Sequence, residues 1–316
     1  MGASSIFIDG EAGTTGLQIR ERLAGRRDID LMSISPDKRK DPAERRRLLN
    51  AADVAILCLP DAAAIEAVSL IDNPETRVID ASSAHRVTDG WVYGFAEMTG
   101  GQAEAIARAR RVANPGCYPQ GLIATVRPLI GAGLLPASAA ITLNAVSGYS
   151  GGGKSMIADY EAAADPAPYM PYALMLKHKH LPEMRAYSGL DHDPLFQPAV
   201  GAFAQGMITV VPLQLWSLPG APTVRDLHAV LADRYAGETF VDVAPLEIVD
   251  RVAGLDPRSF NDTNRMRIHV FGNDQRRQAM LVAVYDNLGK GASGAAVQNL
   301  NLMLGRAPGA GLSNGA

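Results

Sequence analysis

The sequence predicts an α/β protein with two domains: a first domain built on a doubly wound parallel sheet, and a second of α+β type. In the first third of the chain, short apolar runs alternate with helical stretches, which is typical of a parallel sheet covered by helices. In the middle, strand-like runs gather around few helices, which indicates a mainly antiparallel sheet. The length of 316 residues agrees with two domains, because one core rarely grows beyond about 250–300 residues.

The expected elements of the first domain alternate regularly. Strands are expected at residues 5–9, 30–35, 53–59, 77–80 and 111–113, and helices at residues 15–24 and 62–71. The run at residues 53–59 (DVAILCL) is apolar throughout. A strand buried on both faces of a parallel sheet has this pattern.

The expected elements of the second domain are grouped differently. Strands are expected at residues 140–146, 206–213, 266–271 and 279–284, and helices at residues 120–130 and 224–235, before a C-terminal helix at about residues 292–304. Successive strands without regular crossover helices favour antiparallel pairing.

The composition excludes several classes of protein. It is 47% hydrophobic and 20% charged, as in ordinary globular proteins, and a net charge of -3 gives no electrostatic reason to expect nucleic acid or an anionic membrane as partner. No run approaches the roughly 18 apolar residues of a membrane helix. Two cysteines form no disulfide framework, and the N-terminus lacks the pattern of a signal peptide. We therefore expect a cytoplasmic protein.

A glycine-rich turn follows the first strand. Gly10, Gly13, Thr14, Thr15 and Gly16 lie between a strand and a helix, where glycine lets the backbone approach a pyrophosphate at the helix N-terminus. This favours a Rossmann-type dinucleotide-binding domain. The spacing is GxxGxxG rather than GxGxxG, so a simple tight turn is the alternative interpretation.

The end of the second strand bears on the choice of cofactor. NAD-binding proteins usually carry an acidic residue there, which holds the ribose hydroxyls. Here Ser35, Lys38 and Arg39 follow the strand instead. Hydroxyl and cationic groups suit a 2′-phosphate, so NADP is the predicted cofactor; a solvated charged loop is the alternative.

Cys117 is the predicted nucleophile. It stands in the run NPGCYP, where a strand gives way to a helix. The positive end of a helix stabilises a thiolate and lowers the cysteine pKa from about 8.5, and the same N–H groups could hold an oxyanion. Cys58, inside an apolar strand, is predicted to be inert packing.

The segment HKHLPE supplies the predicted proton donor and acceptor. His178 and His180 would share one face if the segment were extended, and Glu183 follows them. No metal motif is present, and two histidines alone make a poor zinc site.

Residues 148–155 (GYSGGGKS) satisfy the phosphate-loop pattern GxxxxGK[ST]. A nucleotide triphosphatase would also need a later strand ending in Asp, for which only Val249-Asp250 is a weak candidate. The other interpretation is a glycine-rich loop that carries Lys154 to the phosphate of a smaller substrate.

Taken together, these motifs resemble the N-acetyl-gamma-glutamyl-phosphate reductases of arginine biosynthesis, in their shorter form. The resemblance covers nearly the whole chain and rests on the glycine-rich turn, DASSAHR at residues 80–86, NPGCYP at 114–119, the loop at 147–154, HKHLPE at 178–183 and DNLGKGA at 286–292. The aspartate-semialdehyde dehydrogenases are similar in fold, but their cysteine motif usually differs from PGCYP.

The resemblance implies a reaction. Cys117 would attack the acyl phosphate of N-acetyl-glutamyl 5-phosphate and expel phosphate, NADPH would reduce the resulting thioester, and N-acetyl-glutamate 5-semialdehyde would leave. His180 would be the acid/base, with His178 or Glu183 holding substrate. Another acyl phosphate, of N-acetyl-aminoadipate or aspartate, is an alternative substrate, because one methylene is worth only about 1–3 kcal/mol in a pocket.

The resemblance also assigns binding residues and domains. Ser83, Arg86 and Lys154 would grip the phosphate, and Asn287 would approach the nicotinamide amide. A surface ion pair is the alternative role for Arg86, and a turn residue for Asn287.

The resemblance also implies the domain bounds. Residues 1–116, completed by a C-terminal helix at 287–305, would form the dinucleotide-binding domain, and residues 117–286 the catalytic and oligomerisation domain. A homodimer or homotetramer is usual for the family.

Two classes of protein remain as rivals to this interpretation. One is a phosphate-loop nucleotide-binding module, which would bind ATP with magnesium. The other is a non-catalytic NADP-binding regulator, against which only the cysteine and histidine motifs speak.

Overall fold

The computed structural model describes residues 2–246 and 254–313, and Val249 and Asp250 lie outside them. The chain divides into two compact units. The first contains the residues up to Gly116 together with Ala292–Ser313, and the second runs from Cys117 to Gly291. The boundary between the units therefore falls at the peptide bond that precedes the predicted nucleophile.

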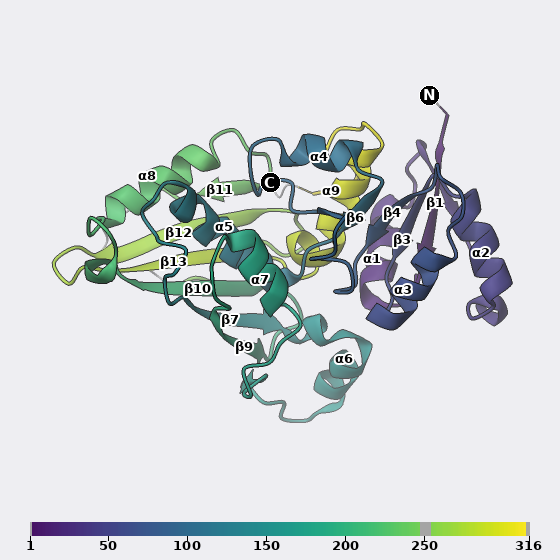
Figure 1. Cartoon of the computed structure of the whole chain (residues 1–316). Coiled ribbons are helices and arrows are strands. Elements are labelled where there is room, and N and C mark those ends of the chain that lie inside the picture. Colours follow the sequence, from purple (N-terminus) through teal and green to yellow (C-terminus); the bar gives the residue numbers. More distant parts are fainter. Residues whose placement is uncertain (1, 247–253, 314–316) are drawn as a thin grey trace. The chain divides into compact units, whose positions relative to one another are not determined.

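The first unit is built on a parallel sheet. Its described strands follow the order β2-β1-β3-β4-β6-β5, and each pairs with its neighbours in parallel (Figure 1). The strands are β1 (Ser4–Asp9), β2 (Ile29–Met32), β3 (Val54–Leu57), β4 (Arg77–Asp80), β5 (Val92–Tyr93) and β6 (Arg111–Ala113). The expected Rossmann-like α/β architecture is confirmed.

Helices cover both faces of this sheet. They are α1 (Thr14–Leu23), α2 (Pro42–Ala51), α3 (Asp61–Ser69), α4 (Gln102–Arg108) and α9 (Gly294–Met303). Alternate residues of β1 enter two separate cores: Ile6 and Ile8 pack with residues of α1 and α9, whereas Phe7 packs with residues of α2 and α3. This alternation explains why the strands read as continuous apolar runs.

The second unit contains a seven-stranded sheet among its described residues, in the order β11-β12-β13-β10-β7-β9-β8. The strands are β7 (Thr142–Gly148), β8 (Tyr169–Pro171), β9 (Leu195–Gly201), β10 (Met207–Gln214), β11 (Val241–Val243), β12 (Met266–Asn273) and β13 (Gln278–Tyr285). Its helices are α5 (Cys117–Gly131), α6 (Gly153–Ala162), α7 (Leu181–Ser188) and α8 (Val224–Arg234). Helices α5 and α8 pack on the sheet.

This second sheet is mixed, so the expectation of a mainly antiparallel sheet holds only in part. β7 pairs with β9 in parallel, and so does β11 with β12, whereas the other neighbours are antiparallel. Both parallel pairs contain a strand that the sequence did not predict. β9 was not predicted because it contains Pro198, and a proline argues against a strand inside a sheet. β11 has three residues, too few for a periodic pattern.

Among the described helices, none has the length and apolar character needed to cross a membrane.

Candidate active site

Cys117 is the first residue of α5 and the first residue of the second unit. Its side chain is partly exposed. Gly291 packs against it closely, because a Cβ at position 291 would lie 3.0 Å from the Cβ of Cys117. The helix start leaves backbone N–H groups unpaired by the helix itself, and these favour an anion. The geometry therefore suits a thiolate.

Cys58 is also partly exposed at its surface, but its sulfur lies in a different environment. It follows β3 and packs against the core of the first unit. Burial, together with the charges of Asp80 and Asp9, raises the pKa of the Cys58 thiol to about 12. A thiol with this pKa is protonated at neutral pH and is a weak nucleophile.

The two histidines of the HKHLPE segment lie side by side. The ring centroids of His178 and His180 are 4.6 Å apart, and the backbone N–H of His180 donates to Nδ1 of His178 at 3.1 Å. The ring of Tyr118, the residue after Cys117, lies 6.4 Å from His178 and 6.1 Å from His180. The structure thus brings the histidines beside the turn that carries the cysteine.

His178 and His180 come together for a different reason than alternation along an extended segment. The segment is not extended: His180 has helical backbone angles (φ -85°, ψ -12°) and stands directly before α7. The histidines therefore come together through a turn and not through strand alternation. Position 182 is a proline at the start of α7, where its missing N–H costs nothing and its fixed φ favours the helix.

Glu183 follows the two histidines and lies in the first turn of α7. Its Oε1 is 4.0 Å from Nε2 of His180, and the residue is only 1% exposed. A buried carboxylate beside an imidazole can orient the ring and stabilise its charged form. The structure thus places the buried Glu183 beside His180, where an orienting carboxylate for a base would stand.

Tyr172 adds a residue that the sequence did not single out. Its ring centroid is 5.9 Å from that of His178. Burial and the nearby Cys117 raise the pKa of Tyr172 to about 12, so its hydroxyl stays neutral. No sequence signal marks it, because Tyr172 lies nine positions before α7, directly after the three-residue strand β8.

The glycine-rich turn is closely packed, and two of its glycines leave no room for a side chain. Gly10 has φ +91°, and a Cβ there would lie 2.3 Å from the carbonyl oxygen of Cys58. A Cβ at Gly16 would lie 2.5 Å from the carbonyl oxygen of Gly10. Helix α1 begins at Thr14, whose Oγ1 is buried and has no hydrogen-bond partner within residues 2–246 and 254–313. A phosphate oxygen at the helix start would provide that partner.

Cationic groups collect at the end of β2. Ser35, Lys38 and Arg39 lie on an exposed turn, and Arg39 contacts the carboxylate of Glu11 at 3.3 Å. Arg20 of α1 contacts the same carboxylate at 2.6 Å and the hydroxyl of Ser33 at 3.3 Å. No local pattern distinguishes Arg20 from the other arginine of α1, Arg22.

Ser83 and Arg86 lie on one loop of the first unit. Ser83 donates to Asp61 through its backbone N–H (2.9 Å) and its hydroxyl (2.8 Å). Arg86 is only 7% exposed and donates to the carbonyl of Asn114 at 3.1 Å, so it is not a surface ion pair. The same loop contains a buried pair that the sequence did not suggest, in which Nδ1 of His85 lies 2.6 Å from Asp80.

The loop with the phosphate-loop pattern is used differently from a nucleotide cradle. The backbone N–H groups of residues 148–150 donate to carbonyls of residues 203–206 at 2.9–3.0 Å. These three N–H groups are therefore not directed at a phosphate, which argues against the triphosphatase interpretation. Lys154 is exposed near the start of α6.

Asn287 belongs to the second unit and is 2% exposed. Its Oδ1 accepts from the N–H of Gly206 at 2.8 Å, and its Nδ2 donates to the hydroxyl of Ser150 at 3.0 Å. The side chain therefore ties two loops together, which is more than a turn residue does. Its approach to a nicotinamide stays a prediction.

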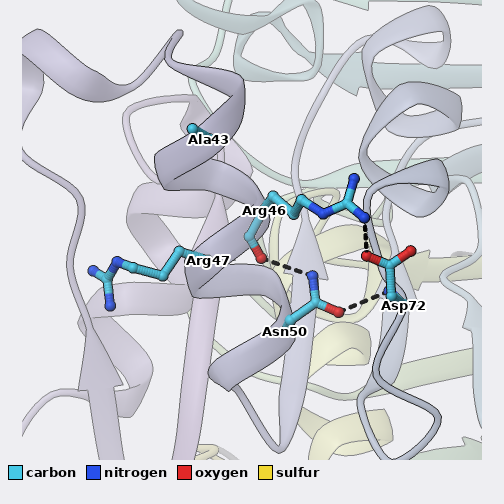
Figure 2. Close-up of a pocket in the computed structure, with 5 residues that line it drawn as sticks. All are labelled: Ala43, Arg46, Arg47, Asn50 and Asp72. Carbon is cyan, nitrogen blue, oxygen red and sulfur yellow. Dashed lines mark hydrogen bonds and ion pairs between the residues drawn. The ribbon is translucent and has the colours of Figure 1, made fainter.

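A surface hollow of about 470 Å³ lies beside α2 of the first unit and is lined by Ala43, Arg46, Arg47, Asn50 and Asp72 (Figure 2). Arg46 pairs with Asp72 there, and the side chain of Asn50 accepts from the backbone N–H of Asp72 at 2.7 Å. None of the residues predicted for catalysis or cofactor binding lines it.

A parallel doubly wound unit with a glycine-rich turn, joined to a unit that begins with a cysteine and carries two adjacent histidines, is typical of a dehydrogenase of the cysteine type. Residues 6–109 match the family described as semialdehyde dehydrogenase, NAD binding domain, and residues 117–287 match semialdehyde dehydrogenase, dimerisation domain. The chain is 63% identical to the N-acetyl-gamma-glutamyl-phosphate reductase of Chelativorans sp. (strain BNC1), covering 95% of this chain and 98% of that protein. It is 55% identical to N-acetyl-gamma-glutamyl-phosphate reductase 2 of Nostoc sp., with 96% and 98% coverage.

Solved structures agree on the fold. Aspartate semialdehyde dehydrogenase II of Vibrio cholerae superposes with a TM-score of 0.73 at 14% identity, over 96% of this chain and 99% of that one. The enzyme of Candida albicans, solved with NADP, gives a TM-score of 0.64 over 96% and 99%. The chain therefore belongs to the semialdehyde dehydrogenase family and, within it, to the N-acetyl-gamma-glutamyl-phosphate reductases.

Proposed function

We propose that this protein reduces N-acetyl-glutamyl 5-phosphate to N-acetyl-glutamate 5-semialdehyde and phosphate, with NADPH as reductant, in arginine biosynthesis. The observation that carries the proposal is Cys117 at a helix start beside the His178–His180 pair. The relatives that bear the name of this reductase support the choice of substrate, at 54–63% identity over nearly the whole chain.

The residues of the second unit would carry the covalent chemistry. The sulfur of Cys117 attacks the acyl carbon, the bond from that carbon to the phosphate oxygen breaks, and phosphate leaves with the electron pair. The product of this step is a thioester on Cys117. The hydride that reduces it is the chemistry that NADPH supplies when bound.

His180 would then move one proton. It protonates the oxyanion of the reduced tetrahedral species and takes the proton back as the carbon–sulfur bond breaks. The aldehyde forms and the sulfur returns as a thiolate. Unperturbed histidine, with a pKa of about 6.5, can do both near neutrality. Glu183, buried beside Nε2 of His180, would hold the ring in place.

The remaining predicted residues would bind ligands. Ser83, Arg86 and Lys154 would hold the substrate phosphate, and His178 would contact the substrate. The buried guanidinium of Arg86, held by backbone carbonyls, supports a fixed orientation, which suits a tetrahedral oxyanion. The homologous acyl phosphates of N-acetyl-aminoadipate and aspartate remain the nearest alternative substrates.

NADP is the proposed cofactor. The turn at residues 10–16 and the unsatisfied hydroxyl of Thr14 fit a pyrophosphate. Ser35, Lys38 and Arg39 would receive the 2′-phosphate, and the position of Arg20 beside Ser33 adds a further cation. Asn287 would contact the nicotinamide amide.

We propose a homodimer or homotetramer that works in the cytoplasm. The second sheet supports the assembly, because the face opposite α5 carries partly exposed apolar side chains, among them Ile208, Val210 and Met280. A catalytic thiol supports the location, because it survives best in a reducing compartment.

The direct test is a paired assay in the reverse direction. N-acetyl-glutamate semialdehyde and aspartate semialdehyde are supplied separately with NADP and phosphate, and NADPH formation is followed by absorbance. We expect phosphate-dependent turnover with the first aldehyde only. Turnover with aspartate semialdehyde alone would reassign the substrate, and magnesium-dependent ATP hydrolysis without NADPH formation would overturn the proposal.

A further inference from the structure

We propose that Tyr285 is a positioning residue for Cys117, an inference that rests on the proposed role of Cys117 as nucleophile. Tyr285 is the last residue of β13 and is fully buried. Its hydroxyl donates to the carbonyl oxygen of Cys117 at 2.7 Å and accepts from the N–H of Gly121 at 3.1 Å. A side chain of the sheet thus enters the first turn of the helix that carries the nucleophile.

The two groups that Tyr285 joins are natural partners of each other. In an α-helix the N–H of residue 121 bonds the carbonyl of residue 117, four positions earlier. Here the tyrosine hydroxyl bridges these groups, so the position of Cys117 is set by β13 as well as by the helix. Burial raises the pKa of Tyr285 well above its usual value, which keeps the hydroxyl protonated and able to donate.

The close packing around Gly121 supports a specific contact between Tyr285 and the first turn of α5. A Cβ at Gly121 would lie 2.8 Å from the hydroxyl of Tyr285 and 2.2 Å from the hydroxyl of Thr209. Glycine is therefore the residue that allows the hydroxyl to reach the helix backbone. Below about 3 Å, a larger residue would displace either the tyrosine or the helix turn.

The chain that follows Tyr285 holds the same turn from another side. Gln120 donates to the carbonyl of Lys290 at 2.7 Å, and Gly291 lies against Cys117. The segment of residues 285–291, which includes most of the C-terminal motif, thus begins with the tyrosine that anchors α5 and ends with the glycine beside Cys117. This gives the motif a role in shaping the nucleophile, separate from any contact with a cofactor.

The consequence concerns the acidity of the thiol. The helix N-terminus lowers a cysteine pKa only when its N–H groups point at the sulfur. Without the tyrosine hydroxyl, the N–H of Gly121 and the carbonyl of Cys117 lose the partner that β13 supplies, so the first turn can shift and move the sulfur. The thiolate should then form at higher pH.

The experiment compares Tyr285→Phe with a matched control, Tyr235→Phe. The hydroxyl of Tyr235 is also buried and donates to the same helix, at the carbonyl of Ala124 (2.8 Å), seven residues after Cys117. Each variant loses one oxygen from a hydrogen bond to α5. The control therefore measures the structural cost of such a loss without disturbing the first turn.

The primary readout is the rate of iodoacetamide alkylation at Cys117 as a function of pH, measured by peptide mass spectrometry without substrate. For Tyr285→Phe we expect the midpoint to rise by about half a pH unit or more and kcat to fall about 10- to 100-fold, since misplacement on the order of 1 Å costs up to about 10²-fold. For Tyr235→Phe we expect the wild-type profile. Identical profiles and kcat in both variants would overturn the proposal.

A second variant covers the case in which Tyr285→Phe does not fold. Thr209→Val keeps the tyrosine but removes the threonine hydroxyl that hydrogen-bonds to it. We expect the midpoint of the alkylation profile to rise by a smaller amount than in Tyr285→Phe. An unchanged midpoint would count against the positioning role. The alkylation profile needs no substrate. If the wild-type protein reduces no N-acetyl-glutamyl phosphate but Tyr285→Phe still shifts the alkylation profile, the proposed function is refuted and the positioning role stands.

Discussion

Nε2 of His180 lies 4.0 Å from Oε1 of Glu183, and both side chains are almost entirely buried. The spacing of three residues around the first turn of α7 makes this possible, because residues i and i+3 of a helix start face the same side. His178 makes a different contact, in which its Nδ1 accepts from the backbone N–H of His180. The two histidines are therefore not equivalent, and the carboxylate favours His180 as the acid/base.

This difference predicts separate kinetic effects. His180→Asn should lower kcat by about 10²–10⁴-fold, the usual contribution of general acid–base catalysis. His178→Asn should act mainly on the substrate KM. Steady-state kinetics of both variants test the assignment, and the reverse pattern would exchange the two roles. Near-normal kcat in both variants would remove the segment from catalysis.

Glu183→Gln tests the orienting carboxylate. The substitution keeps the shape and removes the charge, so the imidazolium of His180 loses its stabilising partner. We expect kcat to fall about tenfold or more with little change in the dissociation constant of NADPH. Asp193→Asn serves as a control, because this exposed carboxylate pairs with Arg185 on the same helix at 3.7 Å. A kcat equal to that of wild type in Glu183→Gln would refute the orienting role.

The two cysteines should differ in reactivity over a wide pH range. Burial raises the pKa of Cys58 to about 12, so less than about 1% of it ionises below pH 10. Iodoacetamide at pH 7–9 should therefore alkylate Cys117 and spare Cys58, with loss of activity in parallel. Cys58→Ala should retain turnover, whereas Cys117→Ala should lose it and still bind NADPH. Labelling of Cys58 first would contradict the assignment.

The cofactor prediction concerns Lys38, Arg39 and Arg20. Replacing Lys38 and Arg39 together by Ala should weaken NADPH binding much more than NADH binding, as measured by fluorescence titration. Arg20→Ala should act in the same direction, because its guanidinium lies 3.3 Å from the hydroxyl of Ser33. Arg46→Ala, in the surface hollow of Figure 2, is the control and should leave both affinities unchanged. Equal losses for both cofactors would show that these cations do not recognise the 2′-phosphate.

Much of the fold could be predicted because its strands carry strong local signals. The strand expected at residues 53–59 appears as β3, which ends two residues earlier at Leu57, and the strand Arg77–Asp80 appears with the expected bounds. β9 could not be predicted, because Pro198 lies within it and its pairing with β7 spans about fifty residues of chain. Such non-local pairing leaves no trace in a short window. The missed strand is also the reason why the second sheet was expected to be mainly antiparallel.

The site shows the same division between local and non-local information. Cys117 and the glycine-rich turn depend on the change from strand to helix, which is visible in a few residues. Tyr285 and Tyr172 could not be predicted, because their importance comes from their contacts in the folded chain. Tyr285 contacts a helix backbone more than 160 positions away, and Tyr172 lies beside the ring of His178. The adjacency of His178 and His180 was expected, but a turn and not strand alternation produces it.

The measurement that tests the thioester mechanism most directly is mass spectrometry of the acyl-enzyme. The protein is mixed with N-acetyl-glutamyl phosphate without NADPH, quenched in acid and digested. We expect an N-acetyl-glutamyl adduct on the peptide that contains Cys117, and its disappearance when NADPH is added before the quench. An enzyme that turns over fully while Cys117 remains unmodified in every quenched sample would contradict the mechanism.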